Sequence, residues 1–236
     1  MTARGVLARL RRMASNGNVE GMARFGIRPT TRVLGISIWD LRVLQREIGT
    51  DHRLAQQLWA SGIHEARILA SFVEDPARVT ERQLDRWVRD FDSWDIVDQV
   101  SELIAKTPHA KKKIREWAVR DEEFVKRTAF ALIAEFAWHD KQMADAEFER
   151  FYPLIRRGAA DERNFVKKAV NWALRNVGKR NRRLNRSAVV LAKDLARGES
   201  RSARWIAADA LRELTGDAVQ HRLAQAASRT RRTGKR

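Results

Sequence analysis

The stretch EFVKRTAFALIAEF, residues 123–136, recurs 41 positions later without a gap as NFVKKAVNWALRNV, residues 164–177. Phe124 of the first copy matches Phe165 of the second, and a Val-Lys pair follows each of them. In both copies apolar residues recur at spacings of three and four, which is the period of one helix face. The stretch therefore predicts a helix that the chain uses at least twice.

The spacing of the two copies falls within the roughly 40–47 residues of HEAT and armadillo repeats. Two further segments look like weaker copies, HEARILASFV at residues 64–73 and SARWIAADALREL at residues 202–214. Each repeat would be a helical hairpin that cannot bury its apolar face alone, so neighbouring repeats stack. We therefore expect an all-α fold, a HEAT-like or armadillo-type α-solenoid of stacked antiparallel helix pairs, curved with a basic concave face.

Helix signals continue along the rest of the chain, which has only 4 prolines and 12 glycines. Thr80 with Gln83 three residues on is a capping box, and Ser93 is a good N-cap for a helix that begins at Trp94. We interpret the first residues, MTARGVLARLRRMAS, as a first helix because they lack the apolar core and cleavage site of a signal peptide. We expect about a dozen helices in a single domain over residues 1–227, followed by a disordered basic tail over residues 228–236.

The composition is strongly basic, with 47 Lys and Arg against 30 Asp and Glu and a formal net charge of +17. A field of that sign attracts polyanions, of which nucleic acid is the abundant one. An acidic membrane surface or ribosomal RNA would satisfy the same charge. No stretch approaches the roughly 18 consecutive apolar residues of a membrane span. The composition therefore indicates a polyanion and no more. We expect a cytoplasmic protein, which would be nucleoid-associated and without a membrane partner if that polyanion is DNA.

The chain lacks the residue patterns of several enzyme classes. It has no cysteine, which excludes disulfides, thiolate nucleophiles and cysteine-ligated metal centres. Its five histidines are scattered, with no pair at a metal-binding spacing: His52, His64, His109, His139 and His221. A glycine-rich phosphate loop and a G-x-S-x-G elbow are also missing. We expect no metal and no other cofactor.

Tryptophan is over-represented, with eight residues against a single tyrosine. Three of them lie on apolar stripes and are expected in the core: Trp59, Trp87 and Trp117. Trp94 stands in the first turn of its helix and shares a face with Asp98, one turn on. Trp172 replaces the small Ala131 of the preceding repeat, so repeat packing does not require it. Trp94 and Asp98 are either a buried indole beside a solvated acid, or a site that places an aromatic wall next to a negative charge.

The surroundings of Trp172 are strongly basic. The cationic residues near it in the sequence are Lys167, Lys168, Arg175, Lys179, Arg180, Arg182, Arg183 and Arg186. An aromatic side chain embedded in a cationic surface is typical of a base or sugar contact beside phosphates. This segment therefore predicts a nucleic-acid interface.

Three motifs in this order, SWDIVDQV, EFVKRTAFAL and NFVKKAVNWALRNVGKRN, resemble the DNA alkylation repair family of HEAT-like DNA glycosylases. The resemblance runs from about Val19 to Leu214, and VLGISIWDLR at residues 33–42 is similar to the turn at the N-terminal side of the family's site. The combination of W-D-x-x-D and K-A-x-x-W patterns in one all-helical repeat chain is more specific than either pattern alone.

The resemblance implies roles for individual residues. The family's catalytic aspartate falls on Asp98, its two base-proximal tryptophans on Trp94 and Trp172, and its arginine near the lesion backbone on Arg127. The expected nucleic-acid contacts are Arg127, Lys126, Lys167, Lys168, Arg175, Lys179, Arg180, Arg182 and Arg183. The chain departs from the family pattern in a longer segment between Arg127 and Trp172. At the N-terminal rim of the site, Ser37 replaces a glutamine and only Phe25 loosely matches an aromatic residue.

The resemblance implies a monofunctional DNA N-glycosylase that hydrolyses the N-glycosidic bond of cationic alkylated purines in duplex DNA. The substrates would be 3-methyladenine and 7-methylguanine, the product an abasic site, and the working protein a monomer without a cofactor. Two alternatives stay open. One is a catalytically silent solenoid that binds DNA or branched and damaged DNA structures, and the other is a protein scaffold with an acidic partner.

Overall fold

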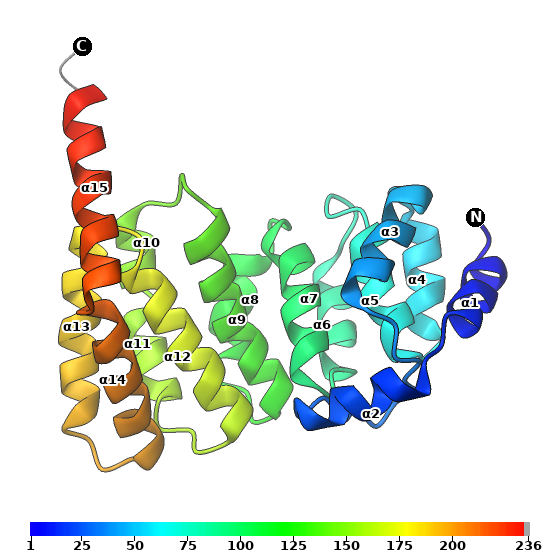
Figure 1. Cartoon of the computed structure of the whole chain (residues 1–236), viewed down its shortest axis with the longest axis horizontal. Coiled ribbons are helices and arrows are strands. Elements are labelled where there is room, and N and C mark those ends of the chain that lie inside the picture. Colours follow the sequence, from blue (N-terminus) through cyan, green and yellow to red (C-terminus); the bar gives the residue numbers. More distant parts are fainter. Residues whose placement is uncertain (234–236) are drawn as a thin grey trace. The chain divides into compact units, whose positions relative to one another are not determined.

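Helices account for the regular secondary structure of residues 1–233, the range that the structure, a computed structural model, describes (Figure 1). Within this range there are fifteen α-helices, and one isolated β-bridge joins Arg32 to Ile63. No helix in this range is long and apolar enough to cross a membrane. The described residues pack as two units, which divide between Lys111 and Lys112. The prediction of an all-helical chain is confirmed.

The first unit is built around α5 (His64–Val73), which packs against α3, α4 and α7. The other helices of this unit are α1 (Ala3–Arg12), α2 (Asn16–Arg24), α3 (Ile38–Ile48), α4 (His52–Ala60), α6 (Glu81–Arg89) and α7 (Trp94–Ala105). Ala66, Leu69 and Ala70 of α5 have no exposed surface. Because α5 is apolar on more than one side, it can be covered by three neighbours at once.

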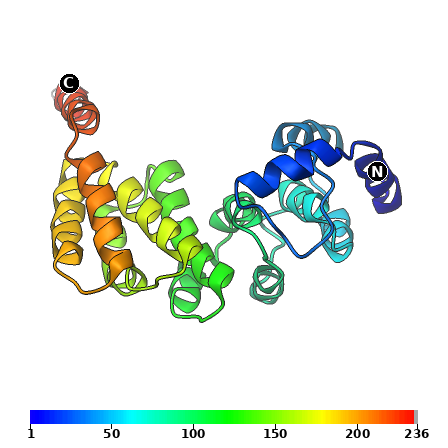
Figure 2. The ribbon, with the colours of Figure 1, turned by 60° about the horizontal axis from the view of Figure 1, so that its bottom comes forward.

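The second unit contains a row of three neighbouring helices, α9 (Glu123–His139), α12 (Asn164–Gly178) and α14 (Arg201–Leu214), coloured green, yellow and orange in Figure 2. Helix α12 packs against α9 on one side and α14 on the other, and α13 packs against both α12 and α14. The remaining helices are α8 (Ala110–Trp117), which spans the boundary between the units, α10 (Asp145–Glu149), α11 (Tyr152–Gly158), α13 (Arg182–Ala196) and α15 (Asp217–Thr233).

The two copies of the repeat lie in neighbouring helices, α9 and α12. The rings of the matching residues Phe124 and Phe165 have centroids 5.5 Å apart. The backbone N–H of Phe165 donates to a carboxylate oxygen of Glu123 at 3.3 Å. The weaker copies are helical too, because residues 64–73 form α5 and residues 202–214 lie in α14. Stacked helical repeats of the HEAT-like kind are therefore the architecture of this chain.

The structure confirms the three predicted core tryptophans but only part of the predicted capping box at Thr80. The hydroxyl of Thr80 accepts from the Gln83 backbone N–H at 3.2 Å, as a cap of α6 should, but the Gln83 side chain donates to Glu74 instead of completing the box. Three tryptophans expected in the core are buried: Trp59, Trp87 and Trp117. The first two of these stack with centroids 3.9 Å apart and join α4 to α6. Burial of such large rings explains their place on apolar stripes.

The C-terminal segment differs from the expectation of a disordered tail from residue 228. Helix α15 continues to Thr233, and residues 234–236 lie outside the described range. Arginine is a good helix former, so a basic composition does not by itself end a helix. The structure has two compact units, as a stack of repeats that contact only their neighbours can have. That residues 1–227 form a single domain stays a prediction.

Candidate functional site

Helix α7 carries the aromatic and acidic pair of the candidate site in the first unit. Trp94 is the first residue of the helix and Asp98 follows one turn later, so both lie on one face. Both side chains are half-buried. The helix is anchored in the core by Ile96, Val97 and Val100, which have no exposed surface. The pair therefore stands on a rigidly packed helix at the edge of the first unit's core.

The indole of Trp94 is held by a hydrogen bond to the end of α2. Its Nε1–H donates to the backbone carbonyl of Phe25 at 3.1 Å. Phe25 is the C-cap residue of α2, and its own side chain is 76% exposed. An exposed aromatic residue therefore adjoins Trp94, which is where the resemblance only loosely placed one.

A second set of hydrogen bonds ties the segment after α2 to the start of α7. Asp92 Oδ2 accepts from the backbone N–H groups of Thr30 and Thr31 at 2.8 and 3.1 Å, and from the Thr30 hydroxyl at 3.0 Å. Asp92 lies two residues before Trp94. These hydrogen bonds fix the loop that carries Phe25 relative to the first turn of α7.

Asp95, between the two proposed site residues, is committed to a buried ion pair. His64 Nε2 lies 2.7 Å from Asp95 Oδ2, and the Ser93 hydroxyl donates to Asp95 Oδ1 at 2.5 Å. Burial alone would raise the pKa of Asp95, but the hydrogen bond and charge of His64 outweigh it, so this pKa is lowered. Burial alone would lower the pKa of His64, but Asp95 and the nearby carboxylates of Glu65 and Asp92 raise it.

The predicted N-cap, Ser93, does begin α7, although its hydroxyl bonds Asp95 and makes no hydrogen bond to the helix N-terminus. The two acids of W-D-x-x-D therefore differ in kind. Asp95 holds the helix in place through His64, whereas Asp98 lies on the half-buried face beside Trp94. The sequence pattern pointed to Asp98 and not to Asp95, for which the only signal was its position one residue after Trp94.

The turn at residues 33–36 is held by a buried acid. Glu65 accepts hydrogen bonds from the backbone N–H of Leu34 at 2.9 Å and of Gly35 at 2.6 Å. Gly35 has φ +74°, and a Cβ there would lie 2.3 Å from the Ser15 carbonyl oxygen. Ser37 then caps α3, accepting from the Asp40 N–H at 3.1 Å. The residue that replaces the family's glutamine is thus an exposed helix cap.

In the second unit, Trp172 is half-buried on α12, beside the interface with α14. The residue before it, Asn171, donates to Asp209 of α14 at 2.7 Å, and Arg175 lies 3.2 Å from the same carboxylate. Ala131, the equivalent of Trp172 in the preceding repeat, has no exposed surface. The same repeat position is therefore core in α9 and partly open in α12, as the unmatched tryptophan suggested.

Arg127 and Lys126, two predicted phosphate contacts, have internal partners. Arg127 is only 5% exposed, and its Nη1 donates to the Phe165 carbonyl at 2.8 Å, joining α9 to α12. Lys126 Nζ lies 3.1 Å from Asp161 Oδ2. Hydrogen bonds from Arg163 and from Lys126 lower the pKa of Asp161 to about 2. In this structure these two cations stabilise the stack of repeats, and a phosphate contact would require their partners to be released.

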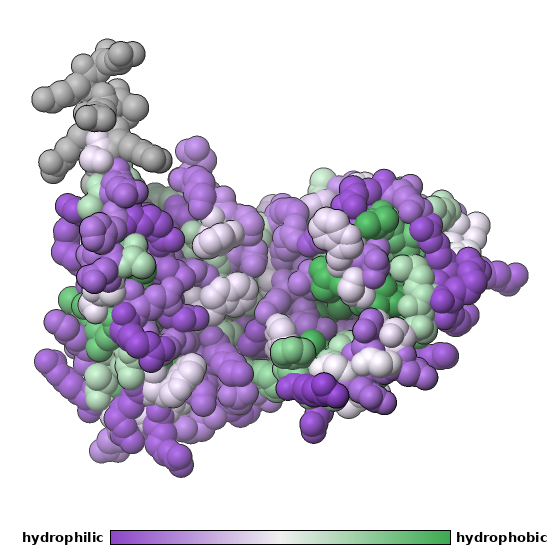
Figure 3. Space-filling view, in the orientation of Figure 1, coloured by the Kyte–Doolittle hydropathy of each residue, from purple (hydrophilic) through white to green (hydrophobic). Residues whose placement is uncertain are grey.

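The other predicted cations fall into two groups. Five have partners within the second unit: Lys167 with the Trp205 ring at 5.0 Å, Arg175 and Lys179 with Glu213 at 2.7 Å, Arg180 with the Ala137 carbonyl at 3.0 Å, and Arg183 with Glu149 at 3.0 Å. Lys168 and Arg182 are exposed. The face over α9, α12 and α14 drawn in Figure 3 is largely hydrophilic, which fits a surface for a charged ligand.

Three exposed tryptophans were not predicted from the sequence. Trp138 at the end of α9 is 57% exposed, Trp205 on α14 is 43% exposed and Trp39 on α3 is 73% exposed. Each has a cation within 6.0 Å of its ring centroid, provided by Lys141, Lys167 and Arg46, respectively. The signal that could have found Trp138 is its position beside His139, Asp140 and Lys141, where an apolar stripe ends.

Comparison with known proteins supports one family. The sequence model of the family described as DNA alkylation repair enzyme matches residues 6–214. Among curated proteins no match is found. A solved structure of a protein from a family related to the HEAT-like repeat DNA glycosylases, with affinity for branched DNA structures, is 18% identical and has a TM-score of 0.73. The alignment covers 82% of this chain and 83% of that one.

At that identity the likeness shows the fold alone, an arrangement of HEAT-like repeats. A designed armadillo repeat protein in complex with a (KR)4 peptide is 16% identical, with 79% of this chain and 80% of that chain covered and a TM-score of 0.37.

Proposed function

Because this chain belongs to the DNA alkylation repair enzyme family, we propose that it is a DNA glycosylase for cationic alkylated purines in duplex DNA. The substrates are 3-methyladenine and 7-methylguanine, and the products are the free base and an abasic site. The observation that carries the proposal is the half-buried Trp94–Asp98 pair on one face of α7, with Phe25 exposed beside it.

The alkylated purine needs little activation as a leaving group when the glycosidic bond breaks. A purine alkylated at N3 or N7 carries a positive charge, and it leaves as a neutral base when the C1′–N9 electron pair moves onto the ring. The sugar becomes cationic at the same time, and this oxocarbenium-like species is the main energetic barrier. Water then adds to C1′ and loses a proton. An enzyme for this reaction therefore needs a negative charge near the sugar more than it needs a general acid.

Asp98 supplies that charge in our proposal. A preorganised carboxylate stabilises a developing cation, and it can accept the proton of the attacking water. Asp95 is a poor candidate for the same role because His64 and Ser93 occupy its two carboxylate oxygens. The neighbouring acid thus serves as a positioning residue for α7, and the catalytic residue is the one a turn further on.

Trp94 supplies an aromatic face for the cationic base. A cation over an indole gains about 0.5–2 kcal/mol, and a neutral base lacks this attraction. The hydrogen bond from Nε1 to the Phe25 carbonyl fixes the plane of the ring before substrate arrives. By the family resemblance, Trp172 contributes a second indole, and Lys168 and Arg182 are the exposed cations best suited to hold phosphates.

The deciding experiment is incubation of the purified chain with duplex DNA methylated by a simple methylating agent. We expect release of 3-methyladenine and 7-methylguanine, with abasic sites in matching amounts. The matched variant is Asp98→Asn, which keeps the size of the side chain and removes its charge. Release by the wild-type protein and not by a folded Asp98→Asn variant would support the proposal, and absence of release by both would contradict it.

The second candidate is a binder of branched DNA without catalysis. It is favoured by the solved neighbour described as having affinity for branched DNA structures, and by the internal position of Arg127, a predicted phosphate contact near the lesion. A band-shift comparison of a four-way junction with a linear duplex of the same sequence tests it. Tighter binding of the junction together with no base release would favour this function over the glycosylase.

A further inference from the structure

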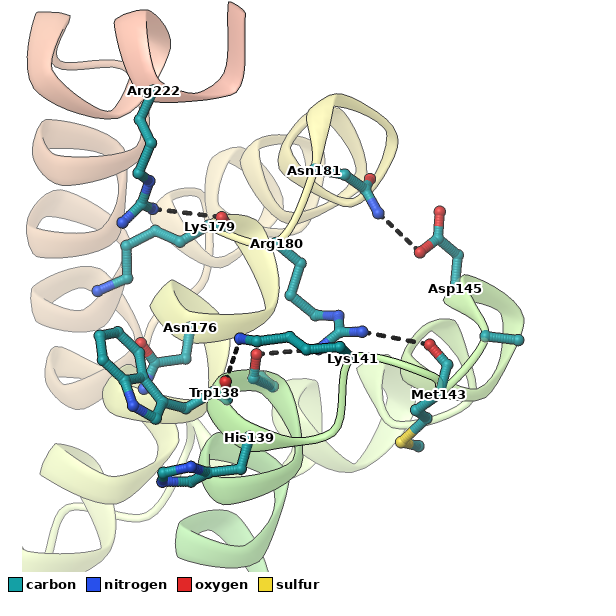
Figure 4. Close-up of a pocket in the computed structure, with 12 residues that line it drawn as sticks. Trp138, His139, Lys141, Met143, Asp145, Asn176, Lys179, Arg180, Asn181 and Arg222 are labelled. Carbon is teal, nitrogen blue, oxygen red and sulfur yellow. Dashed lines mark hydrogen bonds between the residues drawn. The ribbon is translucent and has the colours of Figure 1, made fainter. Parts of the chain in front are cut away.

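A cavity of about 730 Å³ opens at the C-terminal ends of α9 and α12 in the second unit (Figure 4). Its walls include the loop after α9, the connection from α12 to α13 and Arg222 of α15. The volume lies in the range of roughly 300–1,000 Å³ that small-molecule sites occupy. The cavity is separate from Trp94, Asp98 and Trp172. Its lining shares two of the predicted phosphate contacts, Lys179 and Arg180.

Three cations in this pocket donate hydrogen bonds to backbone carbonyls and to no carboxylate of the described residues. The Lys141 ammonium donates to the carbonyl of Trp138, and Arg222 Nη2 donates to the carbonyl of Lys179 at 3.2 Å. Arg180 donates to the carbonyls of Ala137 and Met143 at 3.0 and 3.3 Å. Among the described residues none of the three forms an ion pair, whereas Lys179 is paired with Glu213. The charges of Lys141 and Arg222 are therefore available to an anion, whereas Arg180 lies in the field of Asp140 and Asp145.

The acidic residue of the pocket does not cancel this charge. Asp145 lines the cavity, and its carboxylate accepts from the Asn181 side chain at 2.8 Å. The lining thus carries more positive than negative charge. Arg180 also packs over the Phe148 ring at 4.4 Å, so it builds the wall, while Lys141 and Arg222 remain the cations that can reorient toward a ligand.

An exposed indole supplies the second element of the pocket. Trp138 is 57% exposed although it belongs to a helix whose other residues are largely buried. Leaving so large a ring in water forgoes the stabilisation that burial would give. An exposed indole beside cations offers a stacking platform for a base next to its phosphates.

A side-chain amide at the wall of the pocket supplies the third element. Asn176 lines the same pocket and is only 6% exposed. Among the described residues no hydrogen bond of its side chain is found, and its amide is not one of the buried polar atoms that lack a partner, so the amide is open to the pocket. An amide can donate and accept at once, as the edge of a nucleobase requires. Figure 4 places its side chain, the Trp138 indole and the Lys179 ammonium around one opening.

We propose that this pocket binds one nucleotide of single-stranded DNA, with the base stacked on Trp138, its edge against Asn176 and its flanking phosphates on Lys141 and Arg222. A paired base cannot use the site because its neighbours in the duplex cover both of its faces. The inference rests on the DNA-binding part of the proposed function and not on base excision. It gives the chain a second DNA site, selective for an unpaired segment such as a flap or frayed end.

The test measures binding of a fluorescein-labelled single-stranded 12-mer of thymidine by anisotropy, for the full chain and for Trp138→Ala. Stacking on an aromatic residue contributes about 1–3 kcal/mol per base, so the variant should bind about fivefold or more weakly. Its affinity for a fully paired duplex should stay within about twofold of wild type. Trp39→Ala, which removes another exposed tryptophan outside the pocket, is the matched control and should leave both affinities unchanged.

The role of charge is tested by the double variant Lys141→Gln and Arg222→Gln. The slope of log affinity for the single strand against log salt should fall by about 0.7 for each phosphate that the variant no longer binds. Arg11→Gln with Arg12→Gln lowers the net charge equally on the exposed surface of α1 and should change this slope much less. Photocrosslinking of a 5-iodouracil strand gives a direct readout, with the adduct expected at Trp138.

Three results would overturn the proposal. The first is an unchanged single-strand affinity of Trp138→Ala, and the second is an equal loss of its affinity for duplex and single strand. The third is competition by polyglutamate as strong as that by unlabelled single strand, which would mean that charge alone accounts for binding. Base release from methylated duplex DNA is measured in parallel. If Trp138→Ala loses single-strand binding while neither it nor the wild-type protein releases base, the pocket is supported and the glycosylase proposal fails independently.

Discussion

His64 Nε2 lies 2.7 Å from Asp95 Oδ2, and this buried contact joins α5 to the first turn of α7. Trp94 precedes Asp95 and Asp98 follows it within one turn. The contact between His64 and Asp95 therefore fixes the end of α7 that carries the candidate site. His64 Nδ1 is buried without a hydrogen-bond partner in the described part of the chain, so Asp95 is the imidazole's only strong polar contact there.

The ion pair predicts a pH dependence of stability. The pKa of His64 is raised, so its contribution is complete below the ordinary histidine pKa of about 6.5 and is lost as pH rises through the raised value. The pKa of Asp95 is lowered, so its contribution is complete above the ordinary aspartate pKa of about 3.9 and is lost as pH falls through the lowered value. The pair therefore stabilises the fold most between about pH 4 and 6.5.

We expect His64→Gln to reduce the free energy of unfolding more at pH 5.5 than at pH 8.5, with a decrease of about 1–3 kcal/mol at the lower pH because a buried carboxylate loses its partner. Urea unfolding at both pH values measures this difference. His221→Gln, at an exposed position of α15, is the control and should give the same small change at both. An equal decrease for His64→Gln at the two pH values would mean that the imidazole is neutral in the fold.

The two aspartates of α7 should respond differently to the same substitution. Asp98→Asn should bind duplex DNA within a few-fold of wild type and slow base release by about 100-fold or more, because the charge acts in the transition state. Asp95→Asn should lower the thermal midpoint, because it weakens the buried interaction with His64. Single-turnover rates and melting curves of both variants separate the roles. Unchanged excision by folded Asp98→Asn would assign catalysis to another residue.

The ring and the N–H group of Trp94 can be tested separately. Trp94→Phe keeps an aromatic face but loses the Nε1–H that donates to the Phe25 carbonyl, whereas Trp94→Ala loses both. We expect the alanine variant to lose more activity on 7-methylguanine DNA, because only it lacks the cation–π interaction. Since Trp94 is half-buried, its replacement should cost much less than the roughly 3–5 kcal/mol of a core tryptophan.

We expect the same of Trp172→Ala: it should lose activity on 7-methylguanine DNA, while its free energy of unfolding should change little. Duplexes carrying a neutral lesion such as uracil should be poor substrates for the wild-type protein and for all of these variants. Efficient uracil release by the wild-type protein would contradict a mechanism that depends on a cationic base. Large drops in thermal midpoint would instead assign both tryptophans to the core.

The turn at Gly35 offers a matched pair of glycine substitutions. Gly35 and Gly49 both have φ +74°, so alanine is strained at each. A Cβ at Gly35 would lie 2.3 Å from the backbone carbonyl oxygen of Ser15, whereas a Cβ at Gly49 meets nothing within 4 Å. Gly49→Ala should cost about 1–3 kcal/mol through backbone strain alone. Gly35→Ala should cost clearly more, as measured by urea unfolding, and equal costs would mean that the turn can shift freely.

The sequence predicted the features that depend on helix period and local chemistry. The repeat at residues 123–136 and 164–177 lies in adjacent helices, and helix α7 begins at Trp94 after Ser93. Both features follow from apolar spacing and residue preferences, which act over a few residues. The partners of charged side chains depend on residues distant in the chain. Arg127 is buried against the Phe165 carbonyl, which no local pattern could indicate.

The same reason explains why the exposure of Trp138 was not predicted. A tryptophan at helical spacing is usually in the core. Only the three-dimensional structure shows that neighbouring helices leave Trp138 exposed at the end of α9. His64 and Glu65 are a similar case. Both resemble ordinary polar residues at the start of a helix, yet each is buried and binds a segment about 30 residues away, at Asp95 and at Gly35.

The difference between buried and exposed cations leads to a prediction about DNA affinity. Binding to duplex DNA should be largely electrostatic, with a decrease of about 10³-fold or more between 50 and 200 mM salt. Lys168 and Arg182 are exposed, so Lys168→Gln and Arg182→Gln should each lower the log–log salt slope by about 0.9, without a change in thermal midpoint, if each contacts a phosphate.

Arg127→Gln should show the opposite pattern. Arg127 is 5% exposed and its guanidinium donates to the Phe165 carbonyl. The substitution should therefore destabilise the fold by about 1–3 kcal/mol and leave the salt slope near that of wild type. Anisotropy titrations at a series of salt concentrations, together with melting curves, measure both quantities for the three variants. A flat salt response of the wild-type protein would contradict electrostatic DNA binding. A reduced slope in a stable Arg127→Gln protein would mean that this arginine leaves the carbonyl and contacts a phosphate when DNA binds.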